Sequence, residues 1–258
     1  MFLSELFSLE GRVAVVIGGG GVLAGEMEIG FASAGAGVVI VDVNEEHARE
    51  RAQAVCQAKG KAVVVPADAT LKSDLERALE TALLNFGRVD ILLNAAGLNS
   101  GTPFFQISEE EWSRILDVDL RSVFLACQVL GQHMVEAGRG GSVINISSAS
   151  SGPPLSKVFT YSIAKAGVNQ ITQFLAREWA PYKVRVNAIL PGFFPAEQNR
   201  KLLTEDRVAE ILHHTPMGRF GEAKELVAAA IYLASENASS FVTGAILRVD
   251  GGFGAMTI

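Results

Sequence analysis

Seven short apolar runs, separated by longer segments with helical spacing, constrain the fold of this chain more than any other feature. The runs cover residues 13–17, 38–41, 62–65, 91–94, 143–146, 184–189 and 245–249. Each is nearly continuous in apolar residues, as in a strand covered by helices on both faces, whereas a half-exposed strand would alternate with polar residues. The pattern predicts a doubly wound α/β fold with one seven-stranded parallel sheet and helices on both faces.

Signals of helix ends lie in the segments between these runs. Ser108 followed by Glu111 and Ser73 followed by Glu76 each predict a capping box. Gly60 and Gly87 stand where the preceding helix is expected to stop. The one long stretch of weak periodicity covers residues 191–220. We expect a lid there, over residues 193–220.

Composition and charge limit the class of protein and its partners. A length of 258 residues and 49% apolar content fit one domain, 1–258, with enough apolar surface for a homo-oligomer such as a dimer or homotetramer. A net charge of -6 argues against nucleic acid as a partner. The residues before Glu10 lack a basic region, and no stretch reaches the roughly 18 apolar residues of a membrane span, so no membrane contact and a cytoplasmic protein are expected.

The two cysteines, Cys56 and Cys127, each lie in an apolar helical stretch. Neither has a Cys or His nearby at the spacing of metal ligands. We therefore expect both to be buried as small hydrophobic side chains, with no disulfide and no metal site.

A glycine-rich turn follows the first apolar run directly. Residues 18–21 are all glycine, and a helix is expected from about Glu26. Glycines at this place let the backbone approach a pyrophosphate, which the helix N-terminus favours electrostatically. The spacing departs from the simple G-x-G-x-x-G pattern, and a flexible turn between strand and helix is the alternative.

Polar residues follow the next strands at the same predicted edge of the sheet. Asp42 ends the second run, where a carboxylate can accept hydrogen bonds from both ribose hydroxyls of an adenosine. A 2′-phosphate would be repelled there, and residues 18–25, 43 and 44 include no Arg or Lys, so NAD is favoured over NADP. Asp42 could instead be a turn or cap residue, although Asn44 can serve as the helix cap. Asp68 and the turn at 94–97 could also be turn residues alone.

Tyr161 and Lys165 are four residues apart and share one face of a predicted helix. An ammonium about 4 Å away, at an effective dielectric near 20, would stabilise a phenolate by about 4 kcal/mol. The pair could thus exchange a proton with a substrate near neutral pH. Tyr and Lys at this spacing also occur by chance, with the Tyr packed and the Lys in solvent. Ser148, just after the fifth run, adds a polar side chain at the same edge.

Motifs spread over nearly the whole chain together resemble one enzyme family. They are the turn at 18–21, Asp42, Asp68, the turn at 94–97, residues 144–148, Tyr161 with Lys165, residues 186–188, Pro191 with Gly192, and residues 250–252. This set resembles the short-chain dehydrogenase/reductase family, whose members have a Rossmann-like fold. The resemblance is strongest to bacterial D-mannonate oxidoreductases (fructuronate reductases), through residues 18–23, 191–194 with 197–200, and 215–221. It suggests a sugar acid of the mannonate, fructuronate or gluconate type as substrate.

The resemblance implies a role for each matching residue. Tyr161 would be the general acid in reduction and the base in oxidation, Lys165 would hold the nicotinamide ribose, and Ser148 would bind the carbonyl oxygen. Asp119 takes the place of the fourth catalytic residue. The implied cofactor-binding residues are Gly18, Gly20, Gly21, Val22, Leu23, Asp42, Val43, Asp68, Ala69, Asn94, Ala95, Ala96, Gly97, Tyr161, Lys165, Pro191, Gly192 and Phe194. The implied substrate-binding residues are Ser148, Asn99, Gln198, Asn199 and Arg200.

The chain departs from the family pattern at three places. Ile17 stands where Thr is common, and Val22 and Ala24 stand where Gly is common, so the phosphate-binding turn differs in detail. Asp119 replaces an Asn and loses its amide donors, which bears on the proton relay. Ala196 replaces a Thr, which removes one hydrogen bond to the carboxamide of the cofactor.

Three kinds of function remain open from the sequence. The first is an NAD-dependent dehydrogenase of a sugar acid, and the second a polyol dehydrogenase or a reductase of another ketone class, such as 3-oxoacyl thioesters. The third is a dinucleotide-binding sensor with little turnover, which Ser148, Tyr161 and Lys165 argue against. Polar lid residues favour a hydroxylated anionic substrate, although a solvated helix face explains them equally: Gln198, Asn199, Arg200, His213 and His214.

Overall fold

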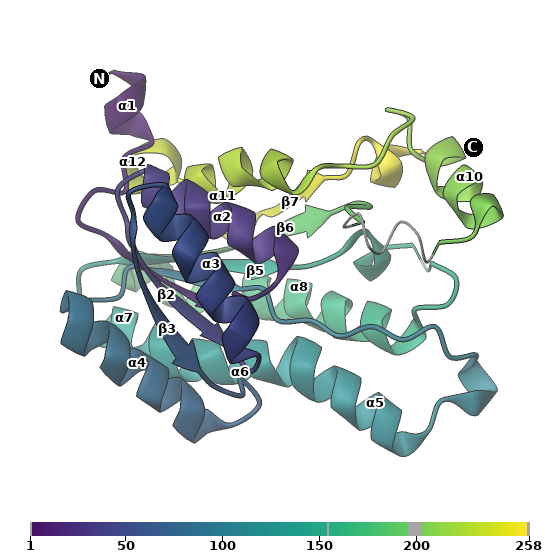
Figure 1. The fold of residues 1–258 in the computed structure, drawn as a ribbon, viewed down its shortest axis with the longest axis horizontal. Helices are drawn as coiled ribbons and strands as arrows, with labels where there is room; N and C mark the ends of the chain where they lie inside the picture. Colours follow the sequence, from purple (N-terminus) through teal and green to yellow (C-terminus); the bar gives the residue numbers. More distant parts are fainter. Residues whose placement is uncertain (1, 154, 196–202, 257–258) are drawn as a thin grey trace.

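The computed structural model describes residues 2–153, 155–195 and 203–256. Its seven strands lie in one sheet, every neighbouring pair is parallel, and the order is β3-β2-β1-β4-β5-β6-β7. The predicted fold class is confirmed (Figure 1). The strands are β1 (Val13–Ile17), β2 (Gly37–Asp42), β3 (Lys61–Pro66), β4 (Ile91–Asn94), β5 (Gly141–Ile146), β6 (Val184–Pro191) and β7 (Ile246–Val249).

Helices cover both faces of the sheet and bury two apolar cores. One core joins the sheet to α4 (Lys72–Phe86), α6 (Ser122–Ala126), α7 (Gln132–Ala137) and α8 (Phe159–Trp179). The other joins it to α2 (Val22–Ser33), α3 (Glu45–Gln57) and α11 (Val227–Ala234). All residues of β1 and β4 are buried, which is why these strands read as unbroken apolar runs.

The described residues form further helical elements besides these. They are α1 (Leu3–Leu6), η1 (Phe104–Gln106), α5 (Glu109–Leu116), η2 (Asp117–Arg121), η3 (Cys127–Gly131), η4 (Ala149–Ser151), η5 (Ala180–Tyr182), α10 (Glu205–His213), η6 (Ala223–Leu226), α12 (Glu236–Ser239) and η7 (Phe253–Ala255). The segments η2 and η3 are π-helical turns inside the long helical stretch that begins at α5. Within the described residues, no helix combines the length and apolar character needed to span a membrane.

Two helix starts differ from the sequence prediction. The helix α2 begins at Val22 rather than near Glu26, because Gly21 already takes the extended conformation of an N-cap. The prediction of a capping box at Ser73 was wrong, because Leu71 is the N-cap of α4 and Ser73 lies inside the helix. There the Asp74 carboxylate accepts a hydrogen bond from the Asp68 backbone N–H at 2.7 Å and so fixes the connection from β3.

Other predicted helix ends are confirmed in part. Ser108 caps α5 by accepting from the Glu111 N–H, but the Glu111 carboxylate accepts from Thr102 instead of completing a capping box. Gly87 ends α4 in the left-handed region, as predicted. After α3, the residue in the left-handed region is Lys59 and not Gly60. A Cβ added to Gly60 would lie 2.5 Å from the Ala32 Cβ. Gly60 therefore serves close packing against α2 rather than the turn.

The two cysteines have different environments. Cys127 is buried, as predicted, and burial raises the pKa of its thiol to about 12. Cys56 is exposed, so the prediction that it is buried was wrong. Val55 and Ala48 are the buried residues of α3, and Cys56 lies on the solvent side of the same helix.

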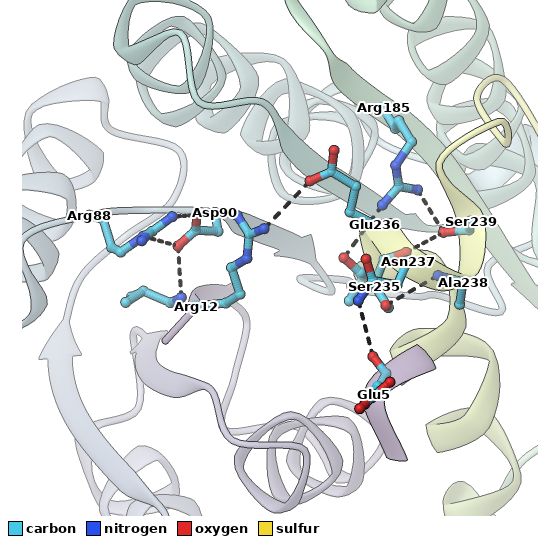
Figure 2. A network of polar contacts seen from close by, with 12 residues as sticks. Glu5, Arg12, Arg88, Asp90, Arg185, Ser235, Glu236, Asn237, Ala238 and Ser239 are labelled. Atoms are coloured by element: carbon cyan, nitrogen blue, oxygen red, sulfur yellow. Dashed lines mark hydrogen bonds and ion pairs between the residues drawn. The ribbon is translucent and has the colours of Figure 1, made fainter. Parts of the chain in front are cut away.

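Charged side chains at the amino ends of the strands hold the sheet together, as Figure 2 shows. Asp90 accepts from Arg88 Nε at 2.7 Å, from Arg12 at 3.1 Å and from the Val13 N–H at 3.0 Å. Arg185 is buried and donates to Ser239 and to the Ala234 carbonyl at the C-terminus of α11, where a cation is favourable. These contacts give the charges here a structural role, at the edge of the sheet opposite the predicted site.

Candidate active site

A cavity of about 700 Å³ lies at the carboxyl ends of β1 to β4. In the sheet β1 lies between β2 and β4, so the chain winds away on both sides of it, which is the place where such sheets bind ligands. Most of the predicted cofactor-binding residues therefore meet in space. Those that line the cavity are Gly18, Gly20, Gly21, Asp42, Val43, Asp68, Ala69, Ala95, Ala96 and Gly97.

The glycine-rich turn passes close to its neighbours. Gly18 has a φ of +75°, and a Cβ added there would lie 2.5 Å from the backbone N and Cα of Ala96. A Cβ on Gly19 would clash with the side chains of Glu28 and Ile40. The turn can therefore be built only from residues without a side chain at these positions. It leaves open backbone at the N-terminus of α2, the arrangement that suits a pyrophosphate.

Asp42 is fixed at the edge of the cavity by two backbone donors. Its Oδ2 accepts from the Gly20 N–H and its Oδ1 from the Asn44 N–H, both at 2.8 Å. The cap of α3 is Asn44, whose side chain accepts from the His47 N–H. Asp42 is thus not a helix cap, and each oxygen keeps a lone pair that can accept from a hydroxyl.

The polar side chains at the ends of β3 and β4 differ in whether they face the cavity. Asp68 lines the cavity, and its Oδ1 accepts from the Thr70 N–H and hydroxyl. Asn94 is buried, and its side-chain amide donates to Asn145 at 2.8 Å in the interior of the sheet. Because its side chain is held in the core, Asn94 can take part in the site only through its backbone.

Tyr161 and Lys165 lie on one face of α8, with the Lys165 Nζ 5.5 Å from the centre of the Tyr161 ring. The Lys165 side chain is only 3% exposed. Its Nζ donates to the Ala96 carbonyl at 3.4 Å, in the turn that follows β4. The ammonium is therefore held beside the tyrosine and against the turn after β4, whose Ala96 lines the cavity.

Asp119, on the π-helical turn η2, forms a buried ion pair with Lys165. Its Oδ1 is 3.2 Å from Nζ, without the alignment of a hydrogen bond, and its Oδ2 accepts from the Leu98 N–H at 2.8 Å. Burial raises the pKa of Asp119, and the Lys165 charge opposes that rise. A Cβ on Gly97 would lie 3.1 Å from Oδ1. Asp119 and Lys165 thus both contact the turn after β4, Asp119 at Leu98 and Lys165 at Ala96.

Ser148 follows β5 and caps the short helix η4. Its Oγ accepts from the Ser150 N–H at 3.2 Å and contacts the Ser150 hydroxyl at 3.0 Å. Nearby, Asn145 donates to the Thr172 hydroxyl at 2.9 Å and so ties β5 to α8. The strand that carries Ser148 and the helix that carries Tyr161 are therefore fixed to each other.

The segment after β6 borders a second cavity, of about 390 Å³. Gly192 donates to the Val249 carbonyl at 3.0 Å, and the Phe194 ring packs where a Cβ on Gly221 would be. Of the predicted residues on the substrate side, Asn99 is exposed in the loop after β4. Ala196, Gln198, Asn199 and Arg200 lie outside the described residues. The second cavity is lined by Ala149, Pro153, Leu155, Ser156, Phe193, Arg207, Glu210, Ile211, His214, Phe253, Gly254 and Met256.

Sequence reasoning missed Glu28 and Arg207. Glu28 reads in the sequence as an ordinary helical acid, yet it is completely buried under the glycine-rich turn. Arg207 stands in α10 after the N-cap Thr204 and reads as a solvated helix residue. No sequence signal distinguishes Arg207. For Glu28 there was a weak signal in two nearby glycines: Gly19 packs on Glu28, and Gly25 packs on its neighbour Arg51.

Comparison with known proteins agrees with this geometry. A family model described as Enoyl-(Acyl carrier protein) reductase matches residues 24–254. The chain is 36% identical to the 2-dehydro-3-deoxy-D-gluconate 5-dehydrogenase of Escherichia coli (strain K12), over 98% of this chain and 99% of that protein. The chain belongs to the short-chain dehydrogenase/reductase family.

Two solved structures of the family are similar over nearly the full length. One, from Haemophilus influenza, bears the name D-mannonate oxidoreductase and has bound NAD; it is 32% identical, with a TM-score of 0.93 and 99% of both chains covered. The other is a gluconate 5-dehydrogenase from Burkholderia cenocepacia J2315 in complex with NADP and tartrate, also 32% identical with a TM-score of 0.93, covering 99% of this chain and 100% of that one. The family uses nicotinamide dinucleotides, and these relatives bind either form.

Proposed function

We propose that this protein is an NAD(H)-dependent oxidoreductase that interconverts a secondary alcohol and a ketone of a sugar acid. The observation that carries the proposal is the placement of Lys165, held by Asp119 and Ala96 beside Tyr161 and next to the turn after β4 that lines the cavity. A binding protein without turnover has no need of a buried ammonium next to a tyrosine.

The protein residues provide proton transfer and positioning. Tyr161 gives its hydroxyl proton to the carbonyl oxygen in reduction and takes it back in oxidation. The positive charge of Lys165 stabilises the phenolate that is left, and Ser148 donates a hydrogen bond to the oxygen as negative charge develops. A nicotinamide cofactor, when bound, supplies or accepts the hydride. The glycine-rich turn and Asp42 would hold its pyrophosphate and adenosine ribose.

NAD is the proposed cofactor form because of the charge at the ribose position. Asp42 is fixed there by the N–H groups of Gly20 and Asn44 and cannot turn away without losing both bonds. A 2′-phosphate would lie against this carboxylate. Arg51 on α3 donates from its Nε to the Gly20 carbonyl at 3.5 Å.

We expect the unmodified protein to prefer NADH over NADPH by at least about a hundredfold in kcat/KM, since a like-charge contact at this site costs several kcal/mol. Asp42→Asn should reduce that ratio, because it removes the charge and keeps the size. Asp68→Asn is the matched control, since it removes a second carboxylate that lines the same cavity. Steady-state kinetics with both cofactors measures the ratio. Equal or better turnover with NADPH in the unmodified protein would refute the proposed cofactor.

The sugar-acid substrate is supported by relatives and by the second cavity. Relatives named for gluconate and dehydrogluconate chemistry match almost the whole chain. The second cavity adjoins η4, directly after Ser148, and presents Arg207 and His214 beside the aromatic rings of Phe193 and Phe253. Glu210 accepts from one guanidinium nitrogen of Arg207 at 3.0 Å. With respect to the residues that the structure describes, the other guanidinium donors of Arg207 are available to a carboxylate.

Arg207→Ala should lower kcat/KM for a keto sugar acid by roughly 10- to 150-fold, the equivalent of about 1.5–3 kcal/mol for a charge-assisted contact. A neutral polyol or ketone of similar size should be affected little. Arg49→Ala, on the exposed side of α3, is the control for loss of a surface arginine. A panel of hexuronates, ketogluconates, polyols and 3-oxoacyl esters with NADH measures both. An equal loss for charged and neutral substrates would remove Arg207 from substrate binding.

A reductase of 3-oxoacyl thioesters is the second candidate. The family model that matches the chain is described by an acyl substrate, and apolar side chains line much of the second cavity. The same panel separates the two, because an acyl reductase would turn over the oxo-esters and leave the sugar acids unchanged.

A further inference from the structure

Glu28, on α2, carries a completely buried carboxyl group. Its side chain has no exposed surface, and neither oxygen has a donor within the described part of the chain. An ionised carboxylate in such a place is strongly unfavourable, so the group shifts its pKa and becomes neutral. Burial raises the pKa of Glu28 from 4.5 to about 8. The carboxyl therefore carries a proton at neutral pH.

Glu28 lies directly beneath the glycine-rich turn. The place where a Cβ on Gly19 would stand is already occupied by Glu28 Oε1, so the carboxyl touches the backbone of the turn. The other face of that turn opens toward the cavity, which Gly18 and Gly20 line. A single layer of backbone thus separates Glu28 from the surface that we assign to the pyrophosphate.

The charged groups around Glu28 come from two neighbouring elements. Asp42 on β2 disfavours its ionisation, and Arg51 on α3 favours it. Both hold the turn at Gly20, Asp42 by accepting from its N–H and Arg51 by donating to its carbonyl. His47 on α3 also lines the cavity next to Gly20. The charge state of Glu28 is therefore coupled to the groups that fix the turn.

We propose that the proton on Glu28 controls how tightly the glycine-rich turn binds the pyrophosphate of the cofactor. This rests on the proposed function, since it requires a dinucleotide at the turn. With Glu28 protonated, the N–H groups at the start of α2 face the pyrophosphate without an opposing charge. With Glu28 ionised, its negative charge repels the bound anion through one backbone layer. Glu28 is a positioning residue, because it acts through Gly19 and does not reach the cofactor.

The proposal predicts a reciprocal effect between the proton and the cofactor. If protonation of Glu28 strengthens binding, binding must raise the affinity of Glu28 for its proton by the same factor. Cofactor affinity is then constant below the pKa of the free protein and falls as the pH rises through it. A rise of one pKa unit on binding corresponds to a tenfold loss of affinity at high pH.

The decisive experiment measures the Kd of NADH between pH 7 and pH 9.5 from its fluorescence. The unmodified protein should lose about tenfold in affinity over this range. Glu28→Gln, which mimics the neutral carboxyl, should match it at pH 7 and show a flat profile. Glu26→Gln removes a partly exposed acid from the same helix and should keep the slope of the unmodified protein. A contribution from His47 or Arg51 would persist in Glu28→Gln, so equal slopes in the two proteins would overturn the proposal.

A second measurement needs no variant. Titration calorimetry of NADH into the unmodified protein at pH 8, in two buffers of different ionisation enthalpy, should detect uptake of a fraction of a proton. Binding without proton uptake overturns the role of Glu28 and leaves the proposed function intact. Absence of NADH binding at any pH overturns both.

Discussion

Replacing Tyr161 with Phe is expected to lower kcat by about 10²- to 10⁴-fold, the contribution typical of a general acid. The change removes only the hydroxyl, and the ring keeps its place beside Lys165 on α8. The affinity for NADH should therefore stay nearly unchanged. Steady-state kinetics with the best substrate of the panel and fluorescence titration of NADH measure the two quantities.

Tyr182→Phe is the matched control for this prediction. Tyr182 is exposed and lies in η5, beyond the end of α8 and away from the cavity at the carboxyl ends of the strands. Its loss of a hydroxyl should leave kcat unchanged. If Tyr161→Phe kept more than about a tenth of the original kcat, the loss would be too small for a general acid and the assignment would fail.

Lys165→Met is expected to abolish turnover and to destabilise the fold by about 3–5 kcal/mol, because it leaves Asp119 as a buried charge without its partner. Met keeps much of the length of the side chain, so packing changes little. Asp119→Asn should restore a large part of this stability in the double variant without restoring activity. As a single change it should stay active, since Lys165 keeps its contact with the Ala96 carbonyl. Denaturant unfolding and steady-state kinetics measure the four proteins.

The loss of stability in Lys165→Met should depend on pH in a definite direction. Burial already raises the pKa of Asp119, and without the opposing charge of Lys165 the rise becomes larger. A carboxyl whose pKa is raised by folding destabilises the protein above its unfolded pKa, and the loss shrinks as the pH falls and the group is protonated. The deficit of Lys165→Met should thus be smaller at pH 5 than at pH 8. If Lys165→Met lowered the free energy of unfolding equally with Asp or with Asn at position 119, the ion pair would contribute nothing to the loss of stability.

The sequence predicted the parts of the site that depend on strand ends. In a parallel sheet all carboxyl ends meet at one edge, so Asp42, Asp68 and the glycine-rich turn could be brought together from their positions after apolar runs alone. The structure places these residues around one cavity. Asn44 as the cap of α3 was equally predictable, because a cap is a local hydrogen bond.

Side-chain direction at the same edge was not predictable in this way. Asn94 stands at the end of β4, yet its amide turns inward to Asn145 on the neighbouring strand. The N-cap of α4 at Leu71 rather than at Ser73 likewise depends on Asp74 reaching back to Asp68. Both the direction of the Asn94 side chain and the N-cap of α4 depend on hydrogen-bond partners outside the local sequence pattern.

The parallel sheet, the glycine-rich turn and the shared helix face of Tyr161 and Lys165 follow from the sequence, because they depend on strand and helix periods and on the conformational freedom of glycine. Which charges are buried together depends instead on tertiary packing. Asp119 pairs with Lys165 across two elements, whereas Glu28 is buried beneath the turn without a hydrogen-bond partner among the described residues. Whether an acid meets a cation, a backbone donor or neither depends on how helices pack on the sheet, and that packing sets the pKa of each group.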